Sequence, residues 1–425
     1  MRLKIVLLFS LCLLLARNSS IAGEVSSPDN NLGATTRPDH IILTWTDDPK
    51  TTQTISWRAV TGTDNGSIRF YEAATSASTV TAAASVKLFR AERGDAQGSF
   101  KLLTVTLSGL KPGARYNYIP VAGEIEGEAH SFMTEPAVEP SFSFLLFGDS
   151  QSGKKDNPDY KPWQKTVSAA WAGNPDARFI MNAGDLVETG QDIRHWNNWL
   201  DAAAEAIASV PEMPVEGNHE TYNVSDTPSK PSYLTELFPV FQNGPEGLKG
   251  QVYSFDYGNA HFSVLDSQED EEAPKNGSIL GKQVLWLEKD LSSTTKSFKI
   301  VLFHKTPYFN KAKRNNELIK AAFCPVAEKY HADVVFNGHD HCLARTFPVR
   351  DGKFYSKPAE GTVYYICGRS GAKFYTDSVM REGDEFFFNP KDQTCYLRID
   401  VSKSVLSIKA FSADGTLLDT YSLTK

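Results

Sequence analysis

The sequence predicts a protein of two domains, an all-β sandwich followed by an α/β domain. Between residues 41 and 133, short segments of alternating polar and apolar residues are separated by turn residues and show no helical period. After Ser141, apolar strand-like runs alternate with helical stretches, which is typical of an α/β domain with a largely buried sheet. Short polar motifs follow several of these runs, so the second domain is expected to carry the chemistry.

The first residues, 1–23, are interpreted as a secretory signal peptide. Two basic residues precede an apolar run over 5–16, and the small residues Ala22 and Gly23 offer a cleavage point. A run of about twelve residues is short for a membrane span, and an uncleaved anchor is the alternative. We therefore expect a secreted or periplasmic protein with no membrane segment after cleavage, starting with a flexible stretch over 24–37.

The sandwich is expected over residues 38–134, with a stiff linker over 135–140 because two prolines hold that stretch extended. Its predicted strands are Ile41–Trp45, Gln53–Trp57, Ile68–Glu72, Thr104–Leu107, Tyr116–Val121 and Ala129–Met133.

The α/β domain is expected over residues 141–425. Its predicted strands and helices are Phe142–Phe147, Lys165–Ala172, Phe179–Asn182, Trp196–Ala208, Gln251–Phe255, His261–Asp266, Gln283–Leu291, Lys299–Phe303, Glu317–His331, Val334–Asn337 and Thr362–Ile366.

Composition and charge exclude several classes of protein. The chain has 425 residues, of which 22% are charged, which is an ordinary globular mixture. Its net charge of −7 argues against a nucleic-acid partner, since phosphate contacts need a basic surface. Four cysteines lie outside the signal peptide, and both two disulfides and four reduced thiols are compatible with that number. They are Cys324, Cys342, Cys367 and Cys395.

Five motifs rich in potential metal ligands occur in order along the second domain. Most contain a glycine, which lets the chain turn sharply where a strand ends, and open α/β sheets bind ligands at that edge. The motifs are Phe147-Gly-Asp149-Ser-Gln151, Asn182-Ala-Gly-Asp185-Leu, Glu216-Gly-Asn218-His219-Glu220, Phe303-His304-Lys-Thr-Pro307 and Asn337-Gly-His339-Asp-His341.

The residue types in these motifs suit first-row metal ions. Two carboxylates, one amide oxygen and three imidazoles are ligands for Fe, Mn, Co or Zn. Six ligands on five strand ends fit two metal ions better than one, and a two-metal site can clamp a phosphoryl group. The candidate ligands are Asp149, Asp185, Asn218, His304, His339 and His341.

Taken together, the five motifs resemble the metallophosphoesterase (calcineurin-like) superfamily. The sandwich, with its fibronectin type III-like run from Leu107 to Tyr118, and the run from Tyr253 to Ser267 are similar to the purple acid phosphatase branch. The resemblance covers nearly all of residues 38–425. It implies a fibronectin III-like sandwich, then an α/β metallophosphoesterase sandwich of two sheets flanked by helices.

The resemblance also implies roles for individual residues. Asp149 and His341 would bind the first metal, Asp185 would bridge both, and three residues would hold the second, namely Asn218, His304 and His339. His219 would face the substrate and stabilise phosphoryl charge or protonate the leaving group. Arg345 falls at the arginine of the Gly-His-x-His-x-x-x-Arg pattern and would bind phosphate; an ordinary salt bridge is the alternative.

The sequence departs from the purple enzymes at two places and from the wider superfamily at a third. The tyrosinate ligand of the purple enzymes follows a Gly-Asp-x-x pattern, and Glu188 stands at that position, so this ligand is either missing or replaced by Glu188. Gln151 stands where the wider superfamily often has histidine, and it would either bind the first metal or form hydrogen bonds around it. Purple enzymes carry a histidine nine or ten residues after the ligand that matches His304, where this chain has Lys313 and Arg314.

The expected function is therefore hydrolysis of small-molecule phosphomonoesters by attack of a metal-bound hydroxide. A phosphodiesterase or nucleotide-directed phosphohydrolase on the same site is the alternative. Less favoured are an inactive binding module and a GDSL-type serine esterase, in which Ser150 would act with Asp192 and His195. The serine esterase would leave the four histidine and asparagine ligands without a role.

Overall fold

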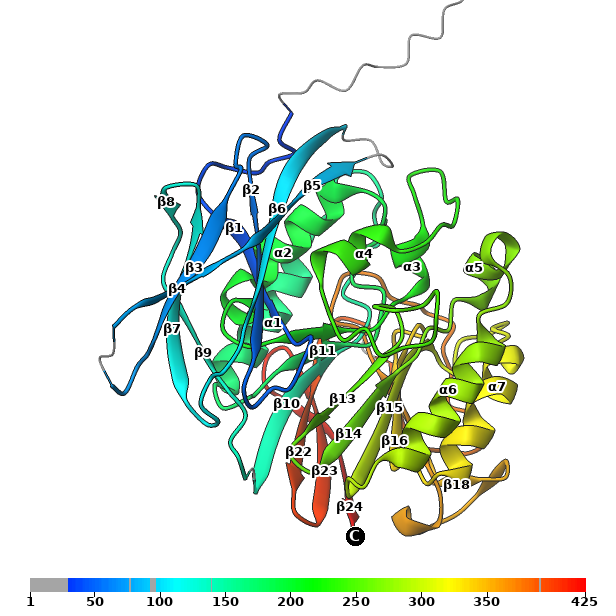
Figure 1. Cartoon of the computed structure of the whole chain (residues 1–425). Coiled ribbons are helices and arrows are strands. Elements are labelled where there is room, and N and C mark those ends of the chain that lie inside the picture. The colour runs from blue at the N-terminus through cyan, green and yellow to red at the C-terminus, as the bar shows by residue number, and fades with distance from the viewer. Residues whose placement is uncertain (1–29, 76–77, 92–96, 139, 390) are drawn as a thin grey trace, which may run out of the picture.

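A computed structural model describes residues 30–75, 78–91, 97–138, 140–389 and 391–425 (Figure 1). The predicted signal peptide lies outside these residues. Among the described residues, no helix is long and apolar enough to cross a membrane. The four described cysteines are buried and free, so the reduced-thiol alternative holds in this structure.

The N-terminal domain consists of two antiparallel sheets that enclose a core around Trp57, Leu103 and Tyr118. Along β2, Ile55 and Trp57 belong to this core, as alternation along a strand requires. The first sheet has the order β1-β2-β6-β5, with β1 Asp39–Thr44, β2 Gln53–Ala59, β6 Gly98–Leu107 and β5 Ser85–Ala91. The second has β4-β3-β7-β8 with β9 beside β7, that is β4 Val80–Ala83, β3 Gly66–Glu72, β7 Arg115–Ala122, β8 Ile125–Glu126 and β9 His130–Met133.

The C-terminal domain is built on two further sheets. The six-stranded sheet has the order β12-β11-β10-β22-β23-β24: β12 Glu212–Pro214, β11 Ile180–Asn182, β10 Ser141–Phe147, β22 Cys395–Ser402, β23 Val405–Ser412 and β24 Leu417–Thr424. The seven-stranded sheet has β13-β14-β15-β16-β20-β17-β21: β13 Tyr253–Tyr257, β14 Ala260–Val264, β15 Phe298–Lys305, β16 Val334–Gly338, β20 Val363–Cys367, β17 Leu343–Thr346 and β21 Asp384–Phe388.

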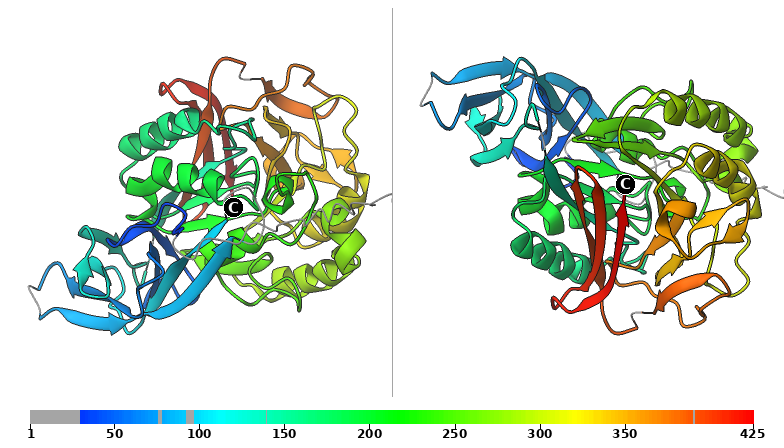
Figure 2. Two further views of the ribbon diagram at one scale, coloured as in Figure 1. Left: turned by 90° about the horizontal axis from the view of Figure 1, so that it is seen from above. Right: turned by 90° about the horizontal axis from the view of Figure 1, so that it is seen from below.

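Helices cover the outer faces of both sheets (Figure 2). The long helices α1 and α2 pack on the six-stranded sheet, while α6 and α7 pack on the seven-stranded sheet. The helices are α1 Lys161–Gly173, α2 Ile193–Ile207, α3 Asn218–Thr221, α4 Ser232–Leu237, α5 Glu269–Asn276, α6 Leu280–Ser293 and α7 Glu317–Lys329. Two smaller features lie between β17 and β20 in the sequence. They are a short hairpin of β18 Val349–Arg350 and β19 Lys353–Phe354, and the 3-10 turn Pro358–Glu360.

Side-chain alternation along the strands produces these layers. On β10, Phe144 and Leu146 enter the core between the sheets, whereas Leu145 and Phe147 face the helices. This four-layer arrangement confirms the predicted fold class. The strands β10, β11 and β12 are parallel, as are β14, β15, β16 and β20, so their carboxyl ends gather the motifs at one edge.

The sandwich is packed against α2 and the neighbouring sheet. The hydroxyl of Tyr118 donates to the carbonyl of Ala208 at 2.7 Å, and Arg58 Nη1 donates to Asn197 Oδ1 at 2.6 Å. Trp45 is 1% exposed and belongs to the core of the C-terminal domain, with its ring 5.4 Å from that of Phe179. The two domains therefore share a hydrophobic core at their junction.

Candidate metal centre

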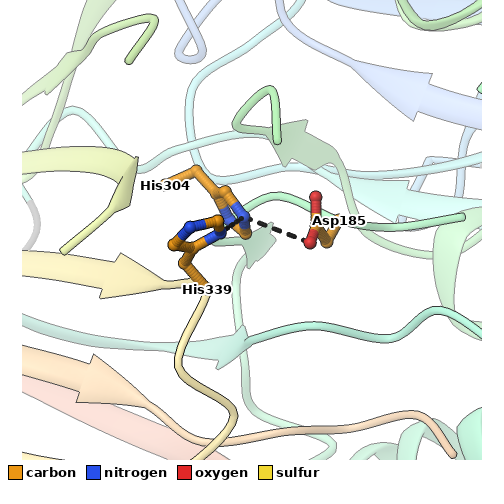
Figure 3. A group of neighbouring side chains, drawn as sticks. All are labelled: Asp185, His304 and His339. Atoms are coloured by element: carbon orange, nitrogen blue, oxygen red, sulfur yellow. Dashed lines mark hydrogen bonds and ion pairs between the residues drawn. The ribbon is translucent and has the colours of Figure 1, made fainter. Parts of the chain in front are cut away.

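Side chains from three strand ends converge in Figure 3, where Asp185, His304 and His339 point toward one another. His304 Nε2 lies 3.2 Å from Asp185 Oδ2 and 3.1 Å from His339 Nδ1. One potential ligand atom from each of the three lies within 4.8 Å of the others, and the same is true of Asp149, Asp185 and His341. Asp185 belongs to both groups, which is the arrangement expected of a carboxylate between two metal ions.

Unusual backbone conformations aim these side chains at the centre. Four of the predicted ligands have positive φ: Asp149 at 45°, Asp185 at 53°, His339 at 75° and His341 at 56°. Positive φ is uncommon outside glycine, and such strain is concentrated at functional sites. Each of the four follows the end of a strand, so the sharp turn directs its side chain across the edge of the sheet.

Close backbone approach explains two of the motif glycines. A Cβ on Gly217 would lie 2.1 Å from the backbone nitrogen of Asp185, and one on Gly184 would lie 2.5 Å from His304 Nδ1. No side chain fits at either distance. Glycine therefore lets the second, third and fourth motifs come together around Asp185.

Carbonyl groups orient two of the imidazoles. His304 Nδ1 lies 2.8 Å from the carbonyl of Ala183, and His341 Nδ1 lies 2.8 Å from that of Lys373. A carbonyl only accepts, so each Nδ1 donates to it and each ring presents its Nε2 to the centre as the ligand atom. This is the orientation in which proteins hold histidine ligands.

Unpaired polar atoms of the candidate ligands also fit a metal site. Among the predicted ligands, three buried polar atoms have no hydrogen-bond partner in the described part of the chain: Gln151 Oε1, Asn218 Oδ1 and His341 Nε2. His341 Nε2 lies 3.2 Å from Asp149 Oδ1, without the geometry of a hydrogen bond. Buried polar atoms normally have partners, and these three are oxygen or nitrogen atoms of predicted ligands. The amide nitrogen of Gln151 donates to Asp185 Oδ2 at 3.0 Å.

Burial and neighbouring charges shift the pKa values of several side chains in the cluster. Burial would raise the pKa of Asp185, but the neighbouring histidines hold it well below its usual range. Burial would lower the pKa of His304, yet the charge of Asp185 raises it to about 9. Burial and the charge of Arg314 lower the pKa of His339. A metal must displace protons from such groups to bind.

Glu220, the last residue of the third motif, fixes the second motif to the third. Its carboxylate accepts hydrogen bonds from the backbone N–H groups of Asp185, Val187 and Gly217 at 2.8–3.1 Å. Burial and the charge of Asp185 raise the pKa of Glu220 to about 8. The sequence analysis assigned no role to Glu220. Its hydrogen bonds in the structure make it a positioning residue, and its place beside His219 in the motif was the only signal in the sequence.

His219 lies beside the centre together with a lysine that the sequence reasoning missed. Its backbone nitrogen donates to Asp185 Oδ1 at 2.9 Å, and its Nδ1 lies 2.7 Å from the carbonyl of Glu188. The Lys373 ammonium lies 2.8 Å from His219 Nε2 and 3.2 Å from Glu188 Oε1. Glu188 Oε2 accepts from the backbone N–H of Gly153, so this carboxylate is held by Gly153 and Lys373.

Arg345 is not brought to this cluster. Its guanidinium donates to Asp419 at 3.0 Å, pairs with Glu385 and lies over the ring of Tyr421. These contacts match the salt-bridge alternative rather than phosphate binding. Arg314 is closer to the ligands, because its Nη2 donates to the carbonyl of His339 at 2.7 Å.

The contacts of Ser150 and His195 do not form the catalytic triad that a serine esterase would need. Ser150 Oγ accepts from Trp199 Nε1 at 2.9 Å and lies 3.1 Å from the carbonyl of Leu186. His195 contacts the hydroxyl of Tyr160 and the carbonyl of Lys155 instead. A nucleophile needs its base within hydrogen-bond reach, and the contacts of Ser150 and His195 are to other groups.

Comparison with protein families agrees with the fold and the cluster. Residues 142–343 match the family model of calcineurin-like phosphoesterases, and residues 38–134 match that of the purple acid phosphatase N-terminal domain. The chain thus carries a calcineurin-like phosphoesterase domain that is preceded by a purple acid phosphatase N-terminal domain.

Individual relatives are distant. An uncharacterized protein of Mycobacterium tuberculosis, Rv2577, is 25% identical over 64% of this chain and 59% of its own length. Acid phosphatase type 7 of Mus musculus is 25% identical over 63% of this chain and 64% of its own length. The structure of purple acid phosphatase PPD1 from yellow lupin seeds superimposes with a TM-score of 0.75 at 18% identity, over 92% of this chain and 74% of that one.

The matches cover only part of most relatives. They span between 32% and 64% of the length of eight curated relatives. Two of these, from Arabidopsis thaliana, are named as probable inactive purple acid phosphatases. The activity proposed below is therefore argued from the site residues of this chain.

Proposed function

We propose that this protein is an exported phosphomonoesterase that works with two bound metal ions. The proposed ligands are Asp149, Gln151, Asp185, Asn218, His304, His339 and His341. The observation that carries the proposal is the pair of ligand groups that share Asp185. Fe, Mn, Zn and Co all suit this donor set.

Bound metal ions would make a water molecule acidic near neutral pH and offset the charge of the phosphate ester. The protein's own part is to hold the ligands and to place polar groups around the substrate. His219 is fixed to Asp185 through its backbone nitrogen, so its ring stays beside the cluster. We assign it to the substrate side, where it would contact a phosphoryl oxygen or the leaving group.

Export is part of the same proposal. Residues 1–23 have the charge, apolar run and small residues of a signal peptide, and cleavage would release the chain to the periplasm or the medium. The expected substrate is a phosphorylated small molecule that is available there.

Metal analysis and activity on one preparation test the proposal. The mature protein should contain two metal ions per chain and hydrolyse p-nitrophenyl phosphate faster than bis(p-nitrophenyl) phosphate. Chelation should abolish the activity, and Mn, Fe, Co or Zn should restore part of it. Faster diester hydrolysis would identify a phosphodiesterase instead.

Two other outcomes would contradict the proposal altogether. Metal-loaded protein that turns over no phosphoester would indicate an inactive binding module. Full activity after metal removal, lost on Ser150→Ala, would support the serine esterase.

A further inference from the structure

The loop over residues 370–373 runs along the first metal-binding motif. The backbone N–H groups of Ser370 and Gly371 donate to the carbonyls of Gly148 and Asp149 at 2.7 and 3.0 Å. The next one, of Ala372, donates to the carbonyl of Gln151 at 3.1 Å. Three consecutive hydrogen bonds fix this loop to the strand end that carries the proposed ligands of the first metal.

Lys373 extends from this loop toward the centre. Its carbonyl accepts from His341 Nδ1 at 2.8 Å, so its backbone is tied directly to a proposed ligand. Its side chain is 22% exposed, and the ammonium reaches His219 Nε2 at 2.8 Å and Glu188 Oε1 at 3.2 Å. The ammonium is therefore held beside the cluster, on a side chain that is not fully buried.

Between Lys373 and His219, the ammonium of Lys373 can only donate hydrogen bonds. The Glu188 carbonyl can only accept, so His219 Nδ1 donates to it, and His219 Nε2 faces the ammonium of Lys373. An ammonium carries three N–H groups, so Lys373 keeps donors for an incoming phosphoryl oxygen beside the one directed at His219.

We propose that Lys373 is a substrate-binding residue that contacts a phosphoryl oxygen and favours dianionic phosphomonoesters over monoanionic phosphodiesters. The inference rests on the proposed function and specifies its substrate class. A fixed positive charge attracts a dianion about twice as strongly as a monoanion at the same distance. Lys373 would thereby supply the phosphate-binding cation that the motif pattern assigned to Arg345.

Charge-removing and charge-keeping variants test this role. Lys373→Met removes the ammonium, Lys373→Arg retains a cation, and Lys155→Met removes an exposed lysine that pairs with Asp226. Metal content is measured for each variant by elemental analysis. Inorganic phosphate binding to the metal-loaded protein is measured by calorimetry, and kcat and KM are measured for both p-nitrophenyl esters.

Lys373→Met should weaken phosphate binding and raise KM for the monoester by roughly 10- to 100-fold, because it removes a charge-assisted hydrogen bond. KM for the diester should rise by only about 3- to 10-fold, because a monoanion loses about half as much attraction to the ammonium and half the free energy is the square root of the fold-change. Metal content should not change. Lys373→Arg should restore part of the phosphate affinity, and Lys155→Met should resemble the wild type.

Unchanged phosphate affinity in Lys373→Met would overturn the inference, as would equal losses on monoester and diester or a loss of metal. Phosphate binding separates this inference from the proposed function. A wild-type protein that binds phosphate through Lys373 without hydrolysing any ester would refute the proposed turnover and leave the assignment of Lys373 standing.

Discussion

At the scale of single residues, the centre combines ligand atoms with groups that hold them in place. Asp185 contacts His304 and accepts a hydrogen bond from the backbone of His219, so its carboxylate joins the candidate ligands to the residue assigned to the substrate side. His219 donates to Asp185 through its backbone, and its ring, 4.0 Å from Asp185 Oδ2, contacts Glu188 and Lys373. Removal of the Asp185 side chain and removal of the His219 side chain should therefore have different effects on metal content and turnover.

His219→Ala should lower kcat by roughly 100- to 10,000-fold, the usual range for loss of a general acid, while the metal content stays near that of the wild type. Asp185→Ala should lose both metals, because its carboxylate belongs to both ligand groups. Elemental analysis and steady-state kinetics check the two variants. Loss of metal from His219→Ala with full occupancy in Asp185→Ala would reverse the assigned roles.

Gly217→Ala tests whether close backbone approach positions Asp185. The added methyl would lie 2.1 Å from the backbone nitrogen of Asp185, so the third motif must shift. We expect a destabilisation of about 1–3 kcal/mol and a reduced metal content. Gly281→Ala is the control, because a Cβ there has no atom within 4 Å. Chemical unfolding and elemental analysis measure both effects, and equal behaviour of the two variants would contradict the steric explanation.

At the scale of elements, His261 joins β13 and β14 to α6. Its Nδ1 lies 2.7 Å from Asp256 Oδ1 and its Nε2 lies 2.8 Å from Asp290 Oδ2. Lys296 also faces Asp256, and Ser263 donates to Asp290. Burial would lower the pKa of His261, but the two carboxylates raise it to about 9. A ring with a carboxylate at each nitrogen is best satisfied when both nitrogens carry protons.

This ion-paired histidine should make stability depend on pH. A pKa raised from 6.5 to about 9 means that the stabilisation is complete below pH 6.5 and is lost as the pH rises through 9. Removal of the imidazolium by His261→Gln should cost about 1–3 kcal/mol more at pH 6 than at pH 10. Urea unfolding of wild type and variant at both pH values measures this difference. His331→Gln, at an exposed position, is the control, and a pH-independent cost at His261 would refute the ion-pair account.

At the scale of the whole molecule, the sandwich and the C-terminal domain form one packed body (Figure 1). Trp45 comes from the sandwich but stacks on Tyr257 at 5.4 Å and lies 6.0 Å from Phe255, both in the C-terminal domain. A polar contact at the same junction joins Thr44 to the carbonyl of Pro239 at 2.5 Å. Removal of the sandwich would therefore open the core of the C-terminal domain.

Trp45→Ala should lower the free energy of unfolding by about 3–5 kcal/mol and leave a single unfolding transition, because the cavity lies in the shared core. Val80→Ala, at a half-exposed side chain of the sandwich, is the control and should change little. Denaturant unfolding followed by fluorescence and far-UV circular dichroism measures both. Separate transitions for the two domains would show that they are independent.

The sequence by itself determined the order of the domains, the alternation of strands and helices, and the candidate ligands. These features are local, because a motif such as Asn337-Gly-His339-Asp-His341 carries its glycine turn and its ligands within five residues. The ends of parallel strands then meet at one edge in any such sheet. The structure brings together Asp149, Asp185, His304, His339 and His341 at that edge.

Only the tertiary structure decided which distant side chains meet. Strands β22–β24 were not among the predicted elements, yet β22 pairs with β10 in the first sheet. Lys373 reaches His219, although 154 residues separate them in the chain. Arg345 lies in a matching motif but turns to Asp419, on the last strand. Such contacts depend on how sheets and loops pack, because no local periodicity or turn preference encodes a partner so far along the chain.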